Sequence, residues 1–423
     1  MDDPTPGALT RPPRAQQGSI RHALATVAGV TEVAALDLRS ADFITDPYPI
    51  FAQLRHESPR WHEQTGMWLA LSHQHANAVL RDRRLGRIWR DREPADYFEP
   101  FNLLHRNQMM ENEPPDHTRL RALVAKAFAR GHIERLRPRI GELAGTLLDR
   151  VAGRTELDLL ADYAEPLPVA VIAELLGVPE ADRPLLRPWS NAIVKMYEYE
   201  RTAQRQGQAV AAAREFADYL RGLARARRVE PGDDLISHLA QIEDGGARLS
   251  ENELVASAIL LLNAGHEASV NVFGNGMVAL FRNPAELARV RTDPSVVETA
   301  VEEMIRYDAP LQLFERTATA DLDLDGVLVN RGEKVAALLG AANRDPAVFV
   351  DPDRMDVTRD PNPHLGFGAG IHFCLGAPLA RLELQMSVPA LLARFPRLEL
   401  AEAPQLRPTF VLRGYQSVRV SVA

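Results

Sequence analysis

The longest unbroken hydrophobic pattern in the chain runs from Glu251 to about Phe281. Apolar residues cover nearly every face of a helix built over these positions, which would be roughly 45 Å long at 1.5 Å per residue. A helix that is apolar all round is expected to lie in the interior of a protein. Its most apolar part, Leu254–Leu262, is far shorter than the about 20 residues that a membrane span needs. We therefore predict a buried central helix and no membrane span.

Between Ile50 and Asp308 most hydrophobic positions repeat with a helical period. The predicted helices are Asp116–Phe128, which follows Pro114-Pro115, then Ile133–Val151, Leu167–Leu176, Arg187–Arg205, Gln208–Arg227 and a short helix capped by Gly232-Asp233-Asp234. Trp61–Ser72 instead alternates about Thr65-Gly66, which predicts a hairpin.

The pattern changes after Pro310. Ala318–Val335 alternates around Asp325-Gly326, which predicts short hairpin strands, whereas Asp345–Pro363 is rich in Pro and Asp and has little periodicity. So long a loop inside a domain is usually functional or tied down by specific contacts. Gly376–Phe395 is helical again, and short strands are expected at the C-terminus. These elements predict a mainly α (α+β) fold in one domain, residues 36–423, after a flexible N-terminal tail, residues 1–35.

Composition narrows the class of protein. The chain has 423 residues, is 46% apolar and carries a net charge of −8. That charge argues against nucleic-acid binding, which needs a basic surface to displace phosphate counterions. A single cysteine fits a reducing compartment and rules out an internal disulfide, and the N-terminus lacks the apolar run of a signal peptide. We expect a cytoplasmic protein.

The single cysteine, Cys374, lies in the glycine-rich stretch 365–376. Its thiol can be a buried apolar group, a nucleophile or a metal ligand. Ile371 stands where a dinucleotide-binding loop needs glycine, and the Gly-Lys-Ser/Thr of a Walker loop is absent. The helix predicted from Gly376 favours a thiolate through its dipole and free N–H groups. A thiolate without a second cysteine or a Cys/His set for zinc suits an axial ligand to a haem iron. Covalent haem would need Cys-x-x-Cys-His.

At this point the sequence resembles a family. Phe367-Gly368-x-Gly370-x-His372-x-Cys374-x-Gly376 is similar to the haem-binding signature of the cytochrome P450 monooxygenases. The resemblance covers roughly residues 38–423. It implies the single-domain P450 fold, with the long central helix over the haem and small β-sheets. It also implies non-covalent haem b, with Cys374 as the axial ligand and with Phe367, Gly368, His372 and Gly376 at the haem.

Two further motifs resemble those of the family. His117 and Arg121 share a helical face and resemble residues that bind haem propionates, as do Arg316 and His372; for each, a solvated surface charge is the alternative. Arg119 is expected to point elsewhere. Glu303 and Arg306 match Glu-x-x-Arg, a pair that also occurs on ordinary helix surfaces. In the family the pair is buried and joined by a further arginine, for which Arg354 is the matching candidate.

The segment Ala264-Gly265-His266-Glu267-Ala268-Ser269 resembles the family's oxygen-activating part of the central helix. The small Ala264 and Gly265 would leave space over the haem. Glu267 would deliver protons, unless it is a buried acid satisfied by backbone groups. The family usually has threonine where this chain has Ala268, and Ser269 lies about 100° further round the helix. A substrate hydroxyl could organise the missing water, Ser269 and Glu267 could hold another water chain, or the reaction could be oxidative coupling or dehydrogenation. The first two routes are favoured.

The resemblance implies a monooxygenase that uses O₂ and two electrons to hydroxylate or epoxidise a small organic molecule. The chain has no flavin or nicotinamide module of its own, so a separate ferredoxin and ferredoxin reductase are expected to supply electrons. Lys126 and Arg130 are candidates for docking the ferredoxin, with plain solvated charges as the alternative. The rival functions are peroxide-driven oxidation, oxidative coupling, and a non-enzymatic haem sensor or carrier, which the small Ala264-Gly265 pair argues against.

The substrate pocket is expected to be lined by five segments. They are Arg84–Gln108, Trp189–Glu200, Ile259–Ser269, Pro310–Phe314 and Phe410–Leu412. The first two are the least patterned, as substrate lids tend to be, and they carry large side chains: Trp89, Tyr97, Phe98, Phe101, Met196, Tyr197 and Tyr199. These predict a bulky hydrophobic or aromatic substrate of the secondary-metabolite type. Glu198 and Glu200 could bind a basic group, although a solvated face is favoured for them.

Overall fold

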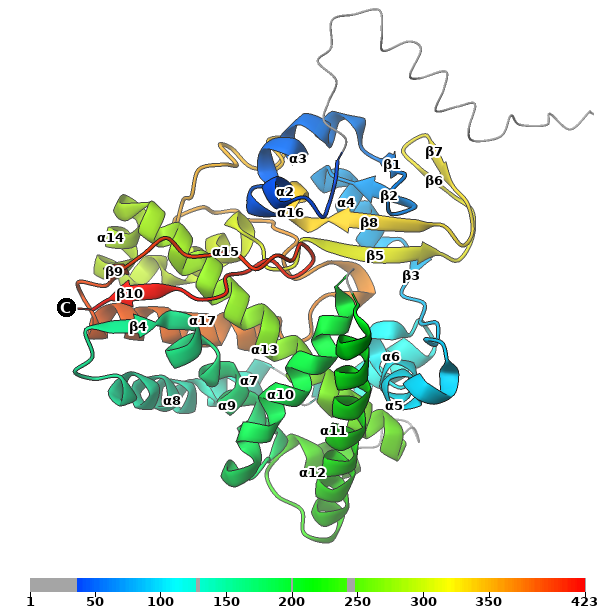
Figure 1. Ribbon diagram of the computed structural model, residues 1–423, viewed down its shortest axis with the longest axis horizontal. Coiled ribbons are helices and arrows are strands. Elements are labelled where there is room, and N and C mark those ends of the chain that lie inside the picture. Colours follow the sequence, from blue (N-terminus) through cyan, green and yellow to red (C-terminus); the bar gives the residue numbers. More distant parts are fainter. Residues whose placement is uncertain (1–35, 127–129, 199–200, 242–247, 423) are drawn as a thin grey trace, which may run out of the picture. The chain divides into compact units, whose positions relative to one another are not determined.

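The computed structural model describes residues 36–126, 130–198, 201–241 and 248–422. The predicted tail, residues 1–35, lies outside the described residues. Leu38 to Ala423 form one compact unit. Its helices (Figure 1) are α2 (Ala41–Thr45), α3 (Tyr48–Leu54), α4 (His73–Arg81), α5 (Ala95–Arg106), α6 (Asp116–Ala125), α7 (Arg130–Arg135), α8 (Arg137–Arg150), α9 (Pro166–Leu176), α10 (Arg183–Val194), α11 (Ala203–Val229), α12 (Leu235–Gln241), α13 (Glu251–Arg282), α14 (Pro284–Thr292), α15 (Val297–Tyr307), α16 (Leu339–Ala342) and α17 (Ala377–Arg394).

The predicted central helix is α13, which runs between α11 and α15 and also packs on α5 and α9 (Figure 1). It begins with a capping box. The Ser250 hydroxyl accepts from the Glu253 amide at 3.2 Å, and the Glu253 carboxylate accepts from the Ser250 amide at 2.7 Å. This arrangement satisfies two backbone N–H groups at the start of the helix. The side chains of α13 are buried along most of its length, which confirms the prediction.

The described residues form three small sheets. The largest has the strand order β1 (Arg60–His62), β2 (Met67–Ala70), β8 (Lys334–Leu338), β5 (Leu313–Ala318) and β3 (Leu85–Gly86), and α4 and α16 lie beside it (Figure 1). The others are β4 (Glu156–Asp158), β10 (Arg419–Ser421) and β9 (Glu399–Leu400), and the hairpin of β6 (Leu322–Leu324) and β7 (Val327–Val329). Asp325 and Gly326 turn that hairpin with φ angles of 53° and 82°. The predicted hairpins at 61–72 and 318–335 are confirmed.

Two predicted helices are divided in the structure. The prediction of one helix over Arg187–Arg205 was wrong: α10 ends at Val194, and α11 starts after Thr202, whose hydroxyl accepts from the Arg205 amide at 3.3 Å as an N-cap. The helix predicted over Ile133–Val151 is likewise α7 followed by α8. Pro138 lies in the first turn of α8, where its missing N–H costs least.

The Pro/Asp-rich segment 345–363 contains neither a helix nor a strand. The side chains of Phe349, Met355 and Val357 are buried and hold this segment against the rest of the protein. The Asp345 carboxylate accepts a hydrogen bond from the His73 amide at 2.8 Å. The expectation that specific contacts hold this loop is confirmed. In the described part of the chain, no helix combines the length and the apolar character needed to cross a membrane.

Candidate active site

The loop that carries Cys374 folds back on itself before α17. The Cys374 amide donates to the Phe367 carbonyl at 2.9 Å. Gly368 and Gly370 have φ angles of +69° and +70°, left-handed values that glycine adopts without strain. A Cβ at Gly370 would also overlap the carbonyl oxygen of Leu80, at the end of α4. The loop therefore has a shape that requires glycine at this position.

Opposing effects act on the Cys374 thiol, which is enclosed by protein but not fully covered. Burial raises its pKa, whereas the amides of Gly376 and Ala377 at the start of α17, and the nearby Arg121 and Arg381, lower it. Burial is the largest effect, so the pKa of the thiol lies above its usual range. The helix start favours a thiolate, and coordination to a metal cation would complete the deprotonation.

The four side chains expected to bind haem propionates come together beside this loop. His117 and Arg121 lie on α6, Arg316 on β5 and His372 on the cysteine loop. The ring centroids of His117 and His372 are 4.5 Å apart, and Arg121 Nη2 donates to the Phe373 carbonyl at 2.8 Å. Arg316 is close enough to His372 to lower its pKa.

These side chains are buried with unused hydrogen-bonding groups. Within the described part of the chain, the ring nitrogens of His117 and the Nε of Arg316 lack hydrogen-bond partners of good geometry, although both residues are 3% exposed. Burial, reinforced by the neighbouring Arg87, lowers the pKa of Arg316 to about 9. Buried polar groups without partners are costly and rare. The cluster therefore fits a bound anion, and the two carboxylates of haem b are acceptors of the right kind.

The small residues of α13 face different neighbours. Ala264 is exposed, although Asn263 before it and His266 two positions after it are buried. Gly265 faces α9, where a Cβ would lie 3.4 Å from the Ile172 side chain. That distance is an ordinary van der Waals contact, so the packing of α9 does not require glycine here, and the space expected over a haem stays a prediction.

Glu267 belongs to a series of ion pairs that reaches the surface. Its carboxylate accepts from Arg407 Nη1 at 3.3 Å. Arg407 lies 4.0 Å from Glu165, which also pairs with Arg187. The Glu267 side chain is 14% exposed and that of Arg187 46%. A guanidinium group, rather than backbone groups, therefore satisfies this acid.

Ser269 is directed toward α17. It hydrogen-bonds to the carboxyl of Glu383, and both residues line a cavity of about 10 Å³, about the space of one water molecule. Burial raises the pKa of Glu383 to about 8. The water chain predicted between Ser269 and Glu267 is therefore not supported, because two positions along a helix correspond to about 200° of rotation.

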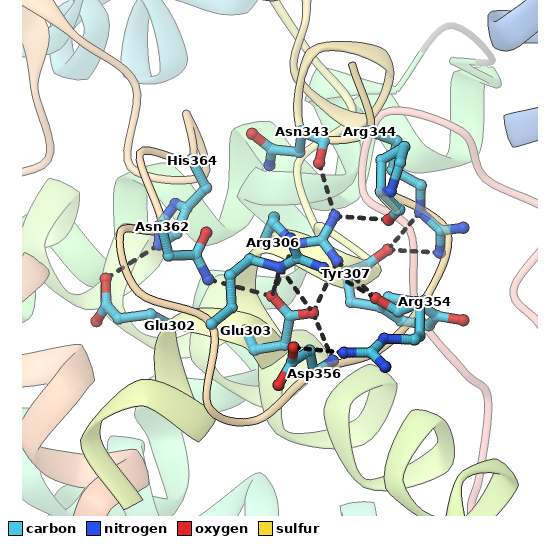
Figure 2. A network of polar contacts seen from close by, with 12 residues as sticks. Glu302, Glu303, Arg306, Tyr307, Asn343, Arg344, Arg354, Asp356, Asn362 and His364 are labelled. Carbon is cyan, nitrogen blue, oxygen red and sulfur yellow. Dashed lines mark hydrogen bonds and ion pairs between the residues drawn. The ribbon is translucent and has the colours of Figure 1, made fainter. Parts of the chain in front are cut away.

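Glu303 and Arg306 form a fully buried ion pair on α15 (Figure 2). Arg306 Nε and Nη2 each donate to the Glu303 carboxylate at 2.7 Å. Arg306 Nη1 donates to the carbonyls of Asn343 and Pro352, both at 2.8 Å. The Asp356 amide donates to Glu303 at 2.9 Å. The pair thus fastens the segment before the cysteine loop to α15.

The third member of this network is Arg359, which corrects the expectation of Arg354. Arg359 Nε donates to Glu303 at 3.2 Å and its side chain is 9% exposed. The Arg354 side chain is 65% exposed and pairs with Asp356 at 2.7 Å (Figure 2). The turn at Asp351, with a φ of 45°, precedes Arg354, and only the backbone carbonyl of Arg354 accepts from Arg306, at 3.3 Å.

The two segments expected to cover the substrate meet in an aromatic cluster. The His105 ring stacks on Trp89 and on Phe101, with centroids 4.3 and 4.2 Å apart. His105 Nε2 lies 3.2 Å from the Tyr197 hydroxyl. Burial lowers the pKa of His105 to about 4, so its ring is neutral at pH 7. This neutral contact joins the first segment to the second.

Other predicted pocket residues are placed differently. Glu198 is 9% exposed, and its carboxylate accepts from the Leu412 amide at 3.1 Å, so the expectation of a solvated face was wrong. Tyr97 is 46% exposed and is a surface residue. Tyr199 and Glu200 lie outside the described residues, as does the side chain of Arg130.

Sequence reasoning missed several residues that complete these clusters. They are Arg87, Glu111 and Glu113 near Arg316, Arg359 at Glu303, Arg407 at Glu267 and Glu383 at Ser269. Glu113 directly precedes Pro114-Pro115 and the His117 motif, which was a usable signal. The others belong to no motif singled out in the sequence, and only the fold brings them to their partners.

Comparisons with known proteins agree with this arrangement. Residues 195–413 match the family described as "Cytochrome P450". The chain is 43% identical to the cytochrome P450 monooxygenase PikC of Streptomyces venezuelae over 390 residues, covering 90% of this chain and 92% of PikC. It is 41% identical to 6-deoxyerythronolide B hydroxylase of Saccharopolyspora erythraea over 401 residues, covering 91% and 98%. The solved structure of the Bacillus subtilis bacillaene polyketide synthase cytochrome P450 PksS matches with a TM-score of 0.84 and 37% identity, covering 92% and 100%.

Proposed function

This chain belongs to the cytochrome P450 family, and from that premise we propose that it hydroxylates or epoxidises a bulky hydrophobic secondary metabolite of the polyketide type. As a member of the family it is a monooxygenase that holds haem b without a covalent link. The observation that carries the substrate proposal is the aromatic cluster of Trp89, Phe101, His105 and Tyr197, which joins the two segments expected to line the pocket. Relatives named for polyketide biosynthesis and for hydroxylation of 6-deoxyerythronolide B support it.

In this proposal Cys374 would hold the haem iron through its thiolate, as the axial ligand that the family resemblance implies. His117, Arg121, Arg316 and His372 would bind the propionates, and Phe367, Gly368 and Gly376 would shape the loop that carries the cysteine. When bound, the haem supplies oxygen activation, and the protein supplies positioning, protons and a dry pocket. The decisive test is the difference spectrum of the reduced protein with carbon monoxide. A Soret band at the wavelength for which the family is named is expected, and its absence would remove the thiolate ligand from the proposal.

Proton delivery is assigned to Glu267, whose ion pairs with Arg407 lead toward the exposed Arg187. Ala268 has no hydroxyl that could organise water, and Ser269 hydrogen-bonds to Glu383. A hydroxyl of the substrate therefore takes that role. We expect a hydroxylated macrolactone to shift the ferric spin state and to be oxidised, and its deoxy analogue to bind but to consume NAD(P)H without forming product.

Ala268→Thr tests whether a substrate hydroxyl replaces the one that this position of the protein lacks. The added hydroxyl should restore product formation with the deoxy analogue, measured as product per NAD(P)H consumed. Equal ratios for the variant and the wild type would show that position 268 has no part in proton delivery. Product that carries no label from ¹⁸O₂ would instead identify coupling or dehydrogenation.

Electrons are proposed to come from a ferredoxin and its reductase in the cytoplasm. Phe373, next to the cysteine, is 40% exposed, and Lys126 is exposed just after α6. A basic and partly apolar face near the cysteine loop would suit an acidic ferredoxin. Reduction by ferredoxin should then slow steeply as salt is raised, because exposed charges are screened within about 10 Å at 0.1 M salt. A salt-independent rate would argue against such docking.

A further inference from the structure

Two arginines from different segments converge on one backbone carbonyl beside the aromatic cluster. Arg92 Nη2 donates to the Met196 carbonyl at 3.4 Å, and Arg201 Nε donates to the same oxygen at 2.8 Å. Burial lowers the pKa of Arg92, and the nearby charge of Arg201 lowers it further. A carbonyl oxygen carries only a partial negative charge, so it does not neutralise two cations. The junction of Arg92, Arg201 and Met196 therefore carries excess positive charge.

The acids near this junction are engaged with other groups. The charge of Glu111 reaches Arg92, but its carboxylate forms an ion pair with Arg87 at 2.7 Å. Glu198 lies near enough to Arg201 for that charge to act on its pKa, but its carboxylate accepts from a backbone amide at 3.1 Å. Within the described part of the chain, neither arginine of the junction forms an ion pair with a carboxylate. The junction therefore fits an anion that the chain does not supply.

Arg92 is held in place at the edge of the aromatic cluster. Its amide donates to Asn102 Oδ1 at 2.9 Å, and Asn102 Nδ2 donates to the Arg92 carbonyl at 3.1 Å. Asn102 is fully buried. The guanidinium carbon of Arg92 lies 5.4 Å from the ring centroid of Phe101 and 6.0 Å from that of Trp89. Its Nε is buried and lacks a hydrogen-bond partner among the described residues. A donor is thus positioned in advance beside an apolar surface.

We propose that Arg92 and Arg201 bind a carboxylate of the substrate, and that the apolar body of this acid lies against the aromatic cluster. A guanidinium group offers a forked pair of donors that matches a carboxylate. The anion is assigned to the substrate because the junction connects the two segments expected to line the pocket. The inference rests on the proposed function, and it narrows the substrate from a bulky hydrophobic metabolite to one that carries an acid group.

The test measures the binding of apolar acids to the purified holoprotein by equilibrium dialysis. The probes are palmitic, abietic and retinoic acids, each compared with its methyl ester, which has the same apolar body and no charge. Because hydrogen bonds to charged groups are the stronger ones, the wild type should bind at least one acid about 10- to 100-fold more tightly than its ester. If no acid of the set binds more tightly than its ester, the proposal is overturned.

Variants of the two arginines locate the preference for the acid. Arg92→Met should remove most of it and leave the affinity for the ester unchanged. Arg92→Lys keeps the charge and loses the fork, so it should retain part of the preference, and it also serves if the methionine variant does not fold. Arg201→Met should have a smaller effect, because Arg201 is exposed and solvent screens its charge. An unchanged preference in both variants of Arg92 would contradict the assignment.

The matched control is Arg106→Met. Arg106 belongs to the same segment as Arg92, at the end of α5, but its guanidinium group pairs with Asp91 at 2.8 Å and with Glu99 at 2.5 Å. The substitution removes the same charge from the same region without touching the junction. The preference for the acid should stay unchanged. An equal loss in Arg106→Met would mean that the preference reflects the charge of the whole surface, and the assignment to Arg92 would fail.

A further arm separates a carboxylate from a phosphate group. Hexadecyl phosphate carries the apolar chain of palmitic acid with a different anion. If it binds more tightly than every acid of the set and loses this advantage in Arg92→Met, the carboxylate assignment is overturned. A wild type that gives the thiolate carbon monoxide band but shows no preference for acids would lose this inference and keep the proposed function. Absence of that band would instead strike the proposed function.

Discussion

Arg306 and Arg316 are both buried arginines, but their surroundings differ. Arg306 is 0% exposed and donates to the Glu303 carboxylate and to backbone carbonyls of the loop 343–354. Arg316, 3% exposed, donates one hydrogen bond to the carbonyl of its neighbour. An unpaired buried charge costs several kcal/mol. The chain itself completes the first cluster, whereas the second is complete only with an anion. Arg306 thus serves the fold, and Arg316 serves a ligand.

The largest effect is expected from breaking the completed cluster. Glu303→Ala or Arg306→Ala leaves the partner buried and unpaired, which should lower the free energy of unfolding by about 3–5 kcal/mol. The loop before Cys374 would lose its attachment to α15, and the protein should not retain haem. Urea unfolding and the ratio of haem to protein after purification measure both effects. Near-normal haem content in either variant would contradict this account of the cluster.

Arg316→Met should weaken haem binding without lowering the stability of the haem-free protein. Replacing an unpaired buried charge with an apolar side chain removes a desolvation cost, so the haem-free protein should unfold at the same or a higher urea concentration. Haem should nevertheless dissociate about 10- to 100-fold faster, corresponding to the loss of about 1.5–3 kcal/mol of charged hydrogen bonding. A haem-free variant that is clearly less stable than the wild type would show that Arg316 supports the fold as Arg306 does.

Glu383 extends the comparison to a buried acid whose partner is the Ser269 hydroxyl and which, among the described residues, has no arginine partner. Its pKa is raised by burial from 4.5 to about 8, so between these pH values the folded state binds more protons than the unfolded state. The stability from this group is full below pH 4.5 and is lost as the pH rises toward 8. The slope is at most about 1.4 kcal/mol per pH unit.

Glu383→Gln keeps the shape of the side chain and removes the titration. We expect the variant to lose this slope and to be more stable than the wild type near pH 8, with little difference at pH 5. Unfolding free energies measured from pH 5 to 8 test this. Ser269→Ala is the control, because it removes the hydroxyl and leaves the acid. Parallel pH profiles for the wild type and Glu383→Gln would contradict a raised pKa at this position.

The sequence predicts the features that depend on local patterns and misses those that depend on tertiary contacts. The central helix, the hairpins and the glycines around Cys374 follow from local patterns, since hydrophobic period and turn chemistry act over a few residues. The two arginine clusters depend on tertiary contacts. Arg87 follows a strand of two residues, and only the fold brings it close enough to Arg316 to lower the pKa of Arg316 beyond the effect of burial alone. Ser269 could be placed on a helix face, but its partner Glu383 comes from α17.

The smallest change in unfolding free energy is expected for one of the two arginines that lie near Glu303. Arg354 and Arg359 both lie in an irregular segment, where no helical or strand period tells which side chain turns inward. The Arg354 side chain is 65% exposed and pairs with Asp356, whereas that of Arg359 is 9% exposed and donates to Glu303. Exposed ion pairs contribute little because solvent and salt screen them, so Arg354→Ala should leave the unfolding free energy essentially unchanged. Arg359→Ala, measured beside it in urea, should cost clearly more and lower the haem content. A larger loss of stability for Arg354→Ala than for Arg359→Ala would place Arg354, and not Arg359, in the network around Glu303. It would also contradict the account of the Glu303 cluster as one that Arg359 completes.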